Sequence, residues 1–291
     1  PLQVSFDSFR ATDLGWGRGW SLSLSTFDQK THRLTLASGV SYRLFIENGQ
    51  VIVKDKKLEN TRVTLDGDKL VVSHQDGTIE ILSRPDYTYD EWLPEQVYSN
   101  EGRSISLSYG LVRGRRLLKE IRDPQHRAVL LDYETEDQSA RIVLWPDIAQ
   151  RRLGFSFRVR DGWLRQIELD DGSGSGLSWS FDYQVLNGML VMTDVGSPGG
   201  SFERIEYEPQ GHRLPSDAPV KSIPAVKRRV LAPGAGRPPI THAYEYSAAN
   251  FLGFQSGLRW TQDGDVLASH GGPYTYTCTE RLMNTQGSEE V

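Results

Sequence analysis

The sequence has very little cysteine and no long apolar run. Its single cysteine, Cys278, excludes an intramolecular disulfide framework and a zinc site built from several cysteines. No uninterrupted apolar stretch approaches the ~20 residues that a membrane-spanning helix needs. Residues 1–10 alternate polar and apolar side chains and lack the apolar region of a signal peptide. We therefore expect neither a membrane span nor a signal peptide in this chain.

Positive charge is not in excess either. Lysine and arginine number 33 against 38 aspartates and glutamates, which gives a formal net charge of -5. Proteins that bind nucleic acid by neutralising phosphates present a surplus of positive charge. The charge balance therefore argues against a nucleic-acid partner.

Patterns typical of helices are scarce as well. The best helical candidate, residues 115–122, is short, lacks an N-cap and places basic side chains where a first turn favours acids. In contrast, the 28 glycines, 12 tyrosines, 10 phenylalanines and 7 tryptophans are typical of strands joined by tight turns. The composition predicts an all-β fold.

Hairpin signals recur along the chain. Residues 20–24 and 42–46 alternate apolar and polar side chains, as half-buried strands do. Asn-Gly and Asp-Gly dipeptides favour the tight turns of β-hairpins, because both of their residues tolerate positive φ angles. These dipeptides begin at Asn48, Asp66, Asp76, Asp161, Asn187 and Asp263. The pattern predicts consecutive antiparallel β-hairpins.

A degenerate internal repeat underlies these hairpins. Each of three segments opens with glycine, places an apolar residue soon after it, turns at an Asp/Gly/Pro cluster and closes at tyrosine. The opening glycines are Gly114, Gly162 and Gly188, and the closing tyrosines are Tyr133, Tyr183 and Tyr207. A period of roughly 20 residues fits one two-stranded hairpin. Such a unit cannot bury an apolar face alone, so we expect neighbouring hairpins to join into a longer sheet, with the tyrosines as cross-strand rungs.

Prolines interrupt the repeat. Residues 208–241 hold seven of the 14 prolines, and proline removes the donors that a sheet ladder needs. We therefore expect a repeat region over residues 1–207, an extended linker or crossing segment over residues 208–241, and a further hairpin unit over residues 242–291 with a frayed C-terminus.

The repeated unit resembles the tyrosine-aspartate (YD) repeat of the rearrangement-hotspot (RHS) family, although Glu134 and Gln184 stand where the nominal aspartate would be. Residues 14–24 followed by 34–44 are similar to the segment that opens RHS-repeat regions. Residues 234–240 followed by 244–254 resemble a segment of large bacterial RHS and Tc-toxin-like proteins.

This resemblance implies a curved sheet that forms part of a hollow spiral shell around a toxic C-terminal polypeptide. The chain would be an N-terminal or middle portion of the repeat region of a bacterial protein that is secreted or displayed at the cell surface. Its partners would be the rest of the shell and the toxic cargo. The self-cleavage motif of the family, Asp-Pro-x-Gly, has no match, and the nearest string, at Asp123, lacks the glycine.

Sequence motifs for catalysis and for cofactor or metal binding are not found in this chain. No nucleophile elbow or phosphate-binding loop is present, and the six histidines lack the spacing of metal ligands. We therefore expect no catalytic residue, cofactor or metal, and a protein that is not an enzyme.

Two alternatives remain open. The first is a carbohydrate-binding or cell-surface adhesion module, in which Trp16, Trp20 and Trp260 stack on glycans. The second is an all-β glycosidase, which would use a pair of acids; neighbouring acids occur at residues 170–171 and 289–290.

Overall fold

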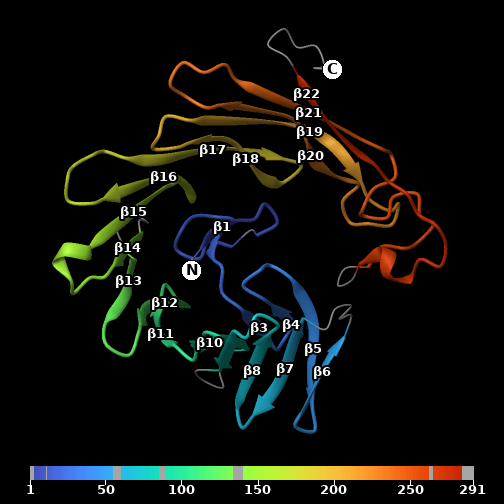
Figure 1. The fold of residues 1–291 in the computed structure, drawn as a ribbon. Coiled ribbons are helices and arrows are strands. Elements are labelled where there is room, and N and C mark those ends of the chain that lie inside the picture. The colour runs from blue at the N-terminus through green and yellow to red at the C-terminus, as the bar shows by residue number, and fades with distance from the viewer. Residues whose placement is uncertain are drawn as a thin grey trace. The chain divides into compact units, whose positions relative to one another are not determined.

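The structure, a computed structural model, describes residues 3–10, 12–54, 60–84, 90–133, 140–261 and 265–283. Within these residues the chain consists of antiparallel β-strands and two short 3₁₀-helices, with no α-helix (Figure 1). The predicted all-β class of consecutive antiparallel hairpins is therefore confirmed. The expected turn at Asp263, Glu134 and the C-terminal residues from Asn284 onward lie outside the described residues.

The chain divides into two compact units. The first comprises Pro1–Phe6, Asp13–Trp163 and Leu169–Ser175, and the second comprises Asp7–Thr12, Leu164–Glu168 and Gly176–Val291. The first 15 strands are β1 (Val4–Phe6), β2 (Trp20–Leu22), β3 (Thr26–Asp28), β4 (Arg33–Thr35), β5 (Ser41–Glu47), β6 (Gln50–Lys54), β7 (Thr61–Asp66), β8 (Lys69–His74), β9 (Ile79–Ser83), β10 (Glu91–Tyr98), β11 (Ser104–Val112), β12 (Arg115–Arg122), β13 (Arg127–Tyr133), β14 (Ala140–Leu144) and β15 (Leu153–Arg160). The remaining strands are β16 (Trp163–Asp170), β17 (Ser178–Leu186), β18 (Met189–Gly196), β19 (Phe202–Arg213), β20 (Ser222–Ala232), β21 (Ile240–Tyr246) and β22 (Cys278–Met283), and the 3₁₀-helices are η1 (Ala149–Arg151) and η2 (Val266–Ser269).

The early strands of the first unit share one apolar core. Strands β3 to β6 pair in order, as do β7 to β10, and β10 pairs with both β9 and β3. Alternation along β8 points Leu70 and Val72 inward, where both are fully buried. They pack with Phe27, Leu34 and other apolar residues from both sets of strands. Both sets of strands therefore contribute side chains to a single core.

The glycine-rich segment near the N-terminus packs against the later strands of the first unit. Trp16 is 1% exposed, and its ring centroid lies 5.3 Å from that of Tyr133 and 4.6 Å from that of Phe157, both in edge-on geometry. The carboxylate of Asp13 accepts a hydrogen bond of 2.7 Å from the Gly15 amide. Gly15 has φ +96°, and a Cβ atom there would lie 2.7 Å from the Tyr133 ring. Glycine is therefore required at residue 15 by both backbone conformation and space.

In the second unit, β17 to β22 pair in sequence order. The prediction of a linker or crossing segment over residues 208–241 is wrong, because β20 pairs with β19 along most of its length and with β21 at residues 228–231. The prolines occupy tolerant positions. Pro209 lies in a β-bulge between Glu208 and His212, and Pro224 lies opposite that bulge and outside the pairing with β21.

Candidate functional site

Register shifts recur in the hairpins of both units. Pairing skips one residue in each of five strand pairs, namely Glu95 in β9–β10, Lys119 in β11–β12, Ala128 in β12–β13, Thr193 in β17–β18 and Lys227 in β19–β20. A β-bulge of this kind disrupts the ladder locally, so that nearby backbone groups need partners from elsewhere.

A tyrosine of the following strand supplies that partner in four of these five cases; the exception is Ala128, because the following strand, β14, contains no tyrosine. The carbonyl of the residue just before the bulged one accepts a hydrogen bond from a tyrosine hydroxyl. The pairs are Tyr109 to Pro94 (2.8 Å), Tyr133 to Leu118 (3.0 Å), Tyr207 to Met192 (2.8 Å) and Tyr246 to Val226 (2.8 Å). Tyr183 makes the same bond across β17 and β16, to Leu164 at 2.7 Å. We call the combination of a bulge and its bonded tyrosine, found at Tyr109, Tyr133, Tyr207 and Tyr246, the bulge–tyrosine unit.

One strand pair shows the converse. The pairing of β13 with β14 runs from Val129 to Tyr133 without a register shift. The following strand, β15, carries Phe157 at the same sequence spacing from Tyr133 that separates Tyr133 from Tyr109. Phe157 is 2% exposed and has no hydroxyl. The tyrosine hydroxyl is thus absent where the bulge is absent.

Burial keeps these phenols as neutral donors. Tyr133 is 6% exposed and Tyr183 is 9% exposed. Burial raises the pKa of Tyr109 and of Tyr133 far above the ordinary range, and burial together with the charge of Glu203 raises the pKa of Tyr207 to about 12. Each hydroxyl therefore keeps its proton at neutral pH and can donate it to the carbonyl.

Cations cover two of the tyrosine rings. The ammonium of Lys119, which is itself a bulged residue, lies 5.1 Å from the centroid of the Tyr133 ring. The guanidinium of Arg165 lies 5.8 Å from the centroid of the Tyr183 ring and donates to Asp182 at 2.6 Å. These cation–π contacts help to hold each ring in place beside its acceptor carbonyl.

The predicted repeat positions divide between turns and strands. Tyr133 and Tyr207 belong to bulge–tyrosine units, Tyr183 makes the same hydroxyl–carbonyl bond, and the three glycines lie in hairpin turns. Gly114, Gly162 and Gly188 have φ values of 75°, 76° and 78° and follow Arg113, Asp161 and Asn187, whose φ values are 50°, 55° and 49°. Two consecutive residues in the left-handed region are the signature of a type I′ hairpin turn. The glycines therefore allow the hairpins to close tightly.

Tyr109, Tyr246 and the bulges were not predicted from the sequence. A register shift has no signature in a sequence, because the extra residue can be of almost any type. The spacing of 24 residues that separates Tyr109 from Tyr133 and Tyr133 from Phe157 is the signal that could have revealed Tyr109.

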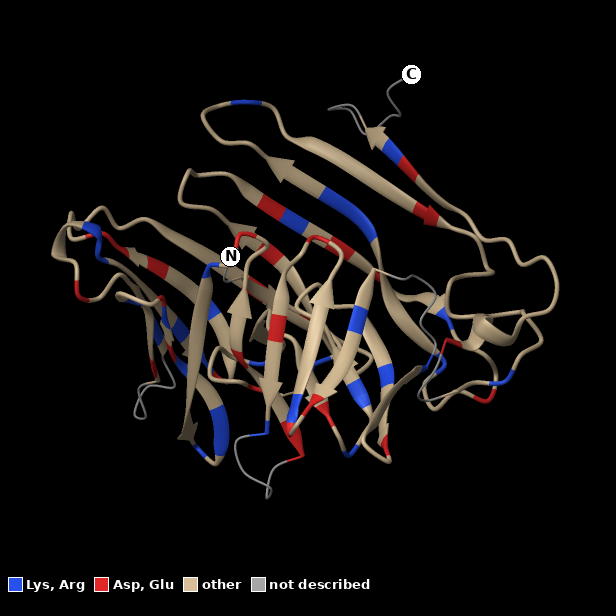
Figure 2. Ribbon diagram, turned by 60° about the horizontal axis from the view of Figure 1, so that its bottom comes forward, with Lys and Arg blue, Asp and Glu red and all other residues tan. Residues whose placement is uncertain are grey.

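Charged residues of both signs lie on neighbouring strands (Figure 2). Several form ion pairs between strands, including Arg204 with Asp194 at 2.9 Å and Arg229 with Glu203 at 2.7 Å. Arg141 likewise bonds to Asp170. The carboxylates in these pairs are engaged by arginines and are therefore accounted for as structural groups. The pairs also agree with the near balance of positive and negative residues in the sequence.

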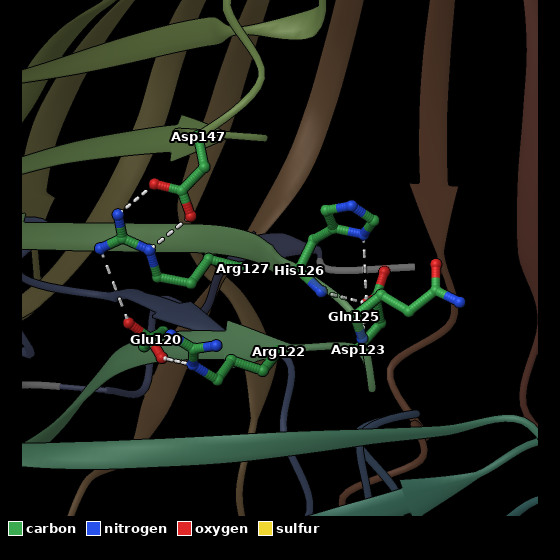
Figure 3. Close-up of polar contacts among 7 residues, drawn as sticks. All are labelled: Glu120, Arg122, Asp123, Gln125, His126, Arg127 and Asp147. Carbon is green, nitrogen blue, oxygen red and sulfur yellow. Dashed lines mark hydrogen bonds and ion pairs between the residues drawn. The ribbon is translucent and has the colours of Figure 1, made fainter.

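Figure 3 shows the charged end of the β12–β13 hairpin. Arg127 donates to both oxygens of Asp147, with Nε 2.7 Å from Oδ2, and this hydrogen bonding lowers the pKa of Asp147. Asp123 accepts hydrogen bonds from the backbone amides of Gln125 (2.7 Å) and His126 (2.6 Å), which lower its pKa. Asp123, in the string closest to the self-cleavage motif, thus caps a turn as an ionised carboxylate.

A buried polar cluster ties together distant parts of the first unit. The Ser25 hydroxyl donates to Oε1 of Glu80 at 2.7 Å, and Nε2 of His74 lies 2.6 Å from the same oxygen. Ser25 is fully buried and Glu80 is 6% exposed. The carboxylate lies between serine and histidine, so the histidine does not face the serine as it must in a catalytic triad. The geometry fits a structural cross-link.

The residues proposed for sugar contact are placed differently from the expectation. Trp16 is 1% exposed and Trp20 is 7% exposed, and Trp20 packs on Phe6 with the ring centroids 5.6 Å apart. The expectation that these two rings are available to stack on a sugar is therefore wrong. Trp260 is half-buried and packs against an apolar cluster that includes Leu214. Of the neighbouring acids, Asp171 accepts hydrogen bonds from Ser173, and residues 289–290 lie outside the described part of the chain.

The remaining expectations concern metals and membranes. Over the part of the chain that the structure describes, no three His, Cys, Asp or Glu side chains gather as a possible metal site. Cys278 is exposed. In the same residues, no helix has the length and apolar character needed to cross a membrane.

No protein-family model matches the sequence, and no curated protein matches it. Among solved structures, the chain is similar to a porin-like protein from Bacteroides uniformis, at 12% identity and a TM-score of 0.36 over 68% of this chain and 87% of that one. It is also similar to the N-terminal domain of the effector protein SpvB from Salmonella typhimurium, at 11% identity and a TM-score of 0.34 over 84% of this chain and 94% of that one.

A third similar structure is TcdB2-TccC3, at 12% identity and a TM-score of 0.34 over 89% of this chain. The match covers only 16% of the TcdB2-TccC3 chain. The structural neighbours thus include a Tc toxin component and an effector domain. With identities of 11–12% and TM-scores of 0.34–0.36, these similarities establish neither a family nor a function.

Proposed function

We propose that this chain is a non-enzymatic shell module of an RHS/YD-repeat toxin-type protein, which encloses or presents a toxic C-terminal polypeptide. The observation that carries the proposal is the bulge–tyrosine unit. It recurs in both compact units, with Tyr109 and Tyr133 in the first and Tyr207 and Tyr246 in the second. A wall made of repeated hairpins needs such a device, because each hairpin must be fixed to the next.

The bulge–tyrosine unit suits a wall that encloses a polypeptide, for a physical reason. Each hydroxyl satisfies a carbonyl that its own strand pair leaves open, so the bulges can bend and twist the sheet without leaving buried polar groups unpaired. Cross-strand ion pairs such as Arg229 with Glu203 add lateral contacts. The partners of such a module are the rest of the shell and its cargo polypeptide, and its location is outside the producing bacterium or at its surface.

Protease protection in the native protein tests this function. We would purify the complete natural protein that contains this chain from its producing cells and treat it with protease, before and after unfolding in urea. The proposal expects a polypeptide that resists protease in the native protein and is degraded after unfolding. Tyr183→Ala together with Tyr207→Ala should abolish the protection.

The matched control is Tyr276→Ala, because Tyr276 is 48% exposed. This variant should leave the protection intact. A native protein without any protected polypeptide, or one in which the double variant protects as well as the unaltered protein, would overturn the proposal.

A further inference from the structure

His212 is a buried histidine near the end of β19. It is 9% exposed, and its Nδ1 atom is buried without a hydrogen-bond partner. Its ring meets that of Tyr246 at a centroid distance of 4.6 Å and that of Phe251 at 5.2 Å, both edge-on. Its partner across the sheet ladder is Ile223 of β20. The imidazole thus lies among apolar and aromatic groups.

None of these contacts offers a negative charge. Tyr246 is the only titratable group among them, and its hydroxyl is already donated to the carbonyl of Val226. The neighbour of His212 on its own strand, Arg213, is a cation whose guanidinium lies 5.7 Å from the Phe254 ring centroid. Burial lowers the pKa of His212 below its usual value. A proton on this ring would place an uncompensated positive charge in a site with little water.

Phe251 belongs to an irregular segment, residues 247–261, that we call the strap. The strap is fastened next to His212, because the buried Asn250 side chain donates to the Arg213 carbonyl at 2.8 Å. Leu252 and Trp260 of the strap pack against an apolar cluster. The cluster consists of Leu214, Ala218 and Ile223. Docking of the strap therefore covers apolar surface directly beside the histidine.

We propose that His212 is an acid-sensitive latch, whose protonation releases the strap from β19 and β20 and uncovers the Leu214–Ala218–Ile223 cluster. This inference is independent of the proposed function. The direction of the pH dependence follows from the lowered pKa of His212. A histidine whose pKa is lowered in the folded protein stabilises that state most fully above the ordinary histidine pKa of about 6.5. The contribution is lost as the pH falls through the lowered value.

Hydrogen exchange followed by mass spectrometry tests the latch on the full chain. Amide exchange over residues 247–261 is compared at pH 7.5 and pH 5.0 after correction for intrinsic rates. We expect several-fold faster exchange at pH 5.0 in the unaltered protein and no such increase in His212→Phe, which keeps an uncharged ring between Tyr246 and Phe251. The control, His126→Gln, removes an exposed histidine of the first unit and should behave as the unaltered protein does.

Two results would overturn the latch. One is corrected strap exchange that is the same at both pH values in the unaltered protein. The other is a His212→Phe variant whose strap loosens at pH 5.0 as much as that of the unaltered protein. An NMR titration of the His212 imidazole gives an answer that needs no variant: a pKa at or above the usual histidine value contradicts the latch, and a pKa below it supports the latch.

Discussion

The hydroxyl of Tyr133 and the carbonyl of Leu118 lie 3.0 Å apart, across β13 and β12, immediately beside the bulged residue Lys119. The bond turns a local irregularity of one strand pair into a link with the next strand. The same hydrogen bond between a tyrosine and the carbonyl beside a bulge joins other neighbouring strands. The bulges are therefore a recurring structural feature of the fold. Phe157, which lacks the hydroxyl, follows a strand pair without a register shift.

Two substitutions of Tyr183 measure the contributions of its hydroxyl and of its ring to stability separately. Tyr183→Phe leaves the buried Leu164 carbonyl without its donor and should lower the free energy of unfolding by about 1–2 kcal/mol. Tyr183→Ala also removes a buried ring and should cost about 3 kcal/mol or more. Urea unfolding measures both. Tyr276→Phe, at an exposed site, should change stability by less than about 0.5 kcal/mol, and equal losses for Tyr183→Phe and Tyr276→Phe would contradict the role of the hydroxyl.

The reverse substitution tests the same rule. Phe157→Tyr places a hydroxyl beside a strand pair that has no bulge, at a site that is 2% exposed. A buried hydroxyl without an acceptor costs about 1–3 kcal/mol in proteins, so the variant should unfold at lower urea concentration. An unchanged midpoint would show that the hydroxyl finds a partner without a bulge.

Alanine substitutions at two glycines with positive φ angles distinguish the cost of backbone strain from the cost of steric conflict. At Gly188, φ +78°, a Cβ atom would meet nothing within 4 Å. Gly188→Ala should therefore cost only the backbone penalty of about 1–2 kcal/mol. Gly15→Ala carries the same backbone penalty and also forces a Cβ atom against the Tyr133 ring. Thermal unfolding should rank Gly15→Ala as clearly the less stable variant, and the opposite order would contradict the packing around Trp16.

Loss of a hydrogen bond in the buried Ser25–Glu80–His74 cluster of the first unit should lower stability. Ser25→Ala removes a donor from the Glu80 carboxylate, which is 6% exposed. A buried group left short of a hydrogen bond costs about 1–3 kcal/mol. Thr35→Ala removes an exposed hydroxyl contact with Ser41 and is the matched control. Chemical denaturation should show a large effect for Ser25→Ala and little effect for the control.

The two aspartates at the β12–β13 hairpin should titrate independently. Arg127→Gln should raise the pKa of Asp147 toward its ordinary value, because the Arg127 hydrogen bonds lower it. The pKa of Asp123 should not move, because backbone amides lower that one. Carboxyl carbon NMR measures both values. The contribution of the Arg127–Asp147 pair to stability is present above the ordinary aspartate pKa and is lost as the pH falls through the lowered value.

The sequence predicted the fold class because strand alternation and turn dipeptides act over short distances. Gly162 and Gly188 were identifiable from the residue before each glycine and the β-rich runs around it. The proline-rich region was misread because a bulge and an unpaired strand end accommodate Pro209 and Pro224, and both features depend on pairing with other strands.

The tertiary contacts were less accessible from the sequence. Trp16 lies next to Tyr133 and Phe157 only after the chain has folded, so a glycine-rich segment with tryptophans reads equally well as an exposed surface. Ser25 and Glu80 are 55 residues apart, and nothing in either neighbourhood marks them as partners. Contacts of this kind depend on which faces the strands present to each other.

The link between Tyr133 and the carbonyl beside Lys119 restricts how such a chain can change length. An insertion or deletion of one residue within β12 or β13 moves the hydroxyl to the opposite side of the sheet, away from its acceptor. Additional residues at the hairpin tip near Gly114 leave that alignment untouched. Related chains should therefore gain and lose residues at hairpin tips, or exchange complete hairpins, while the strand interiors keep a constant length.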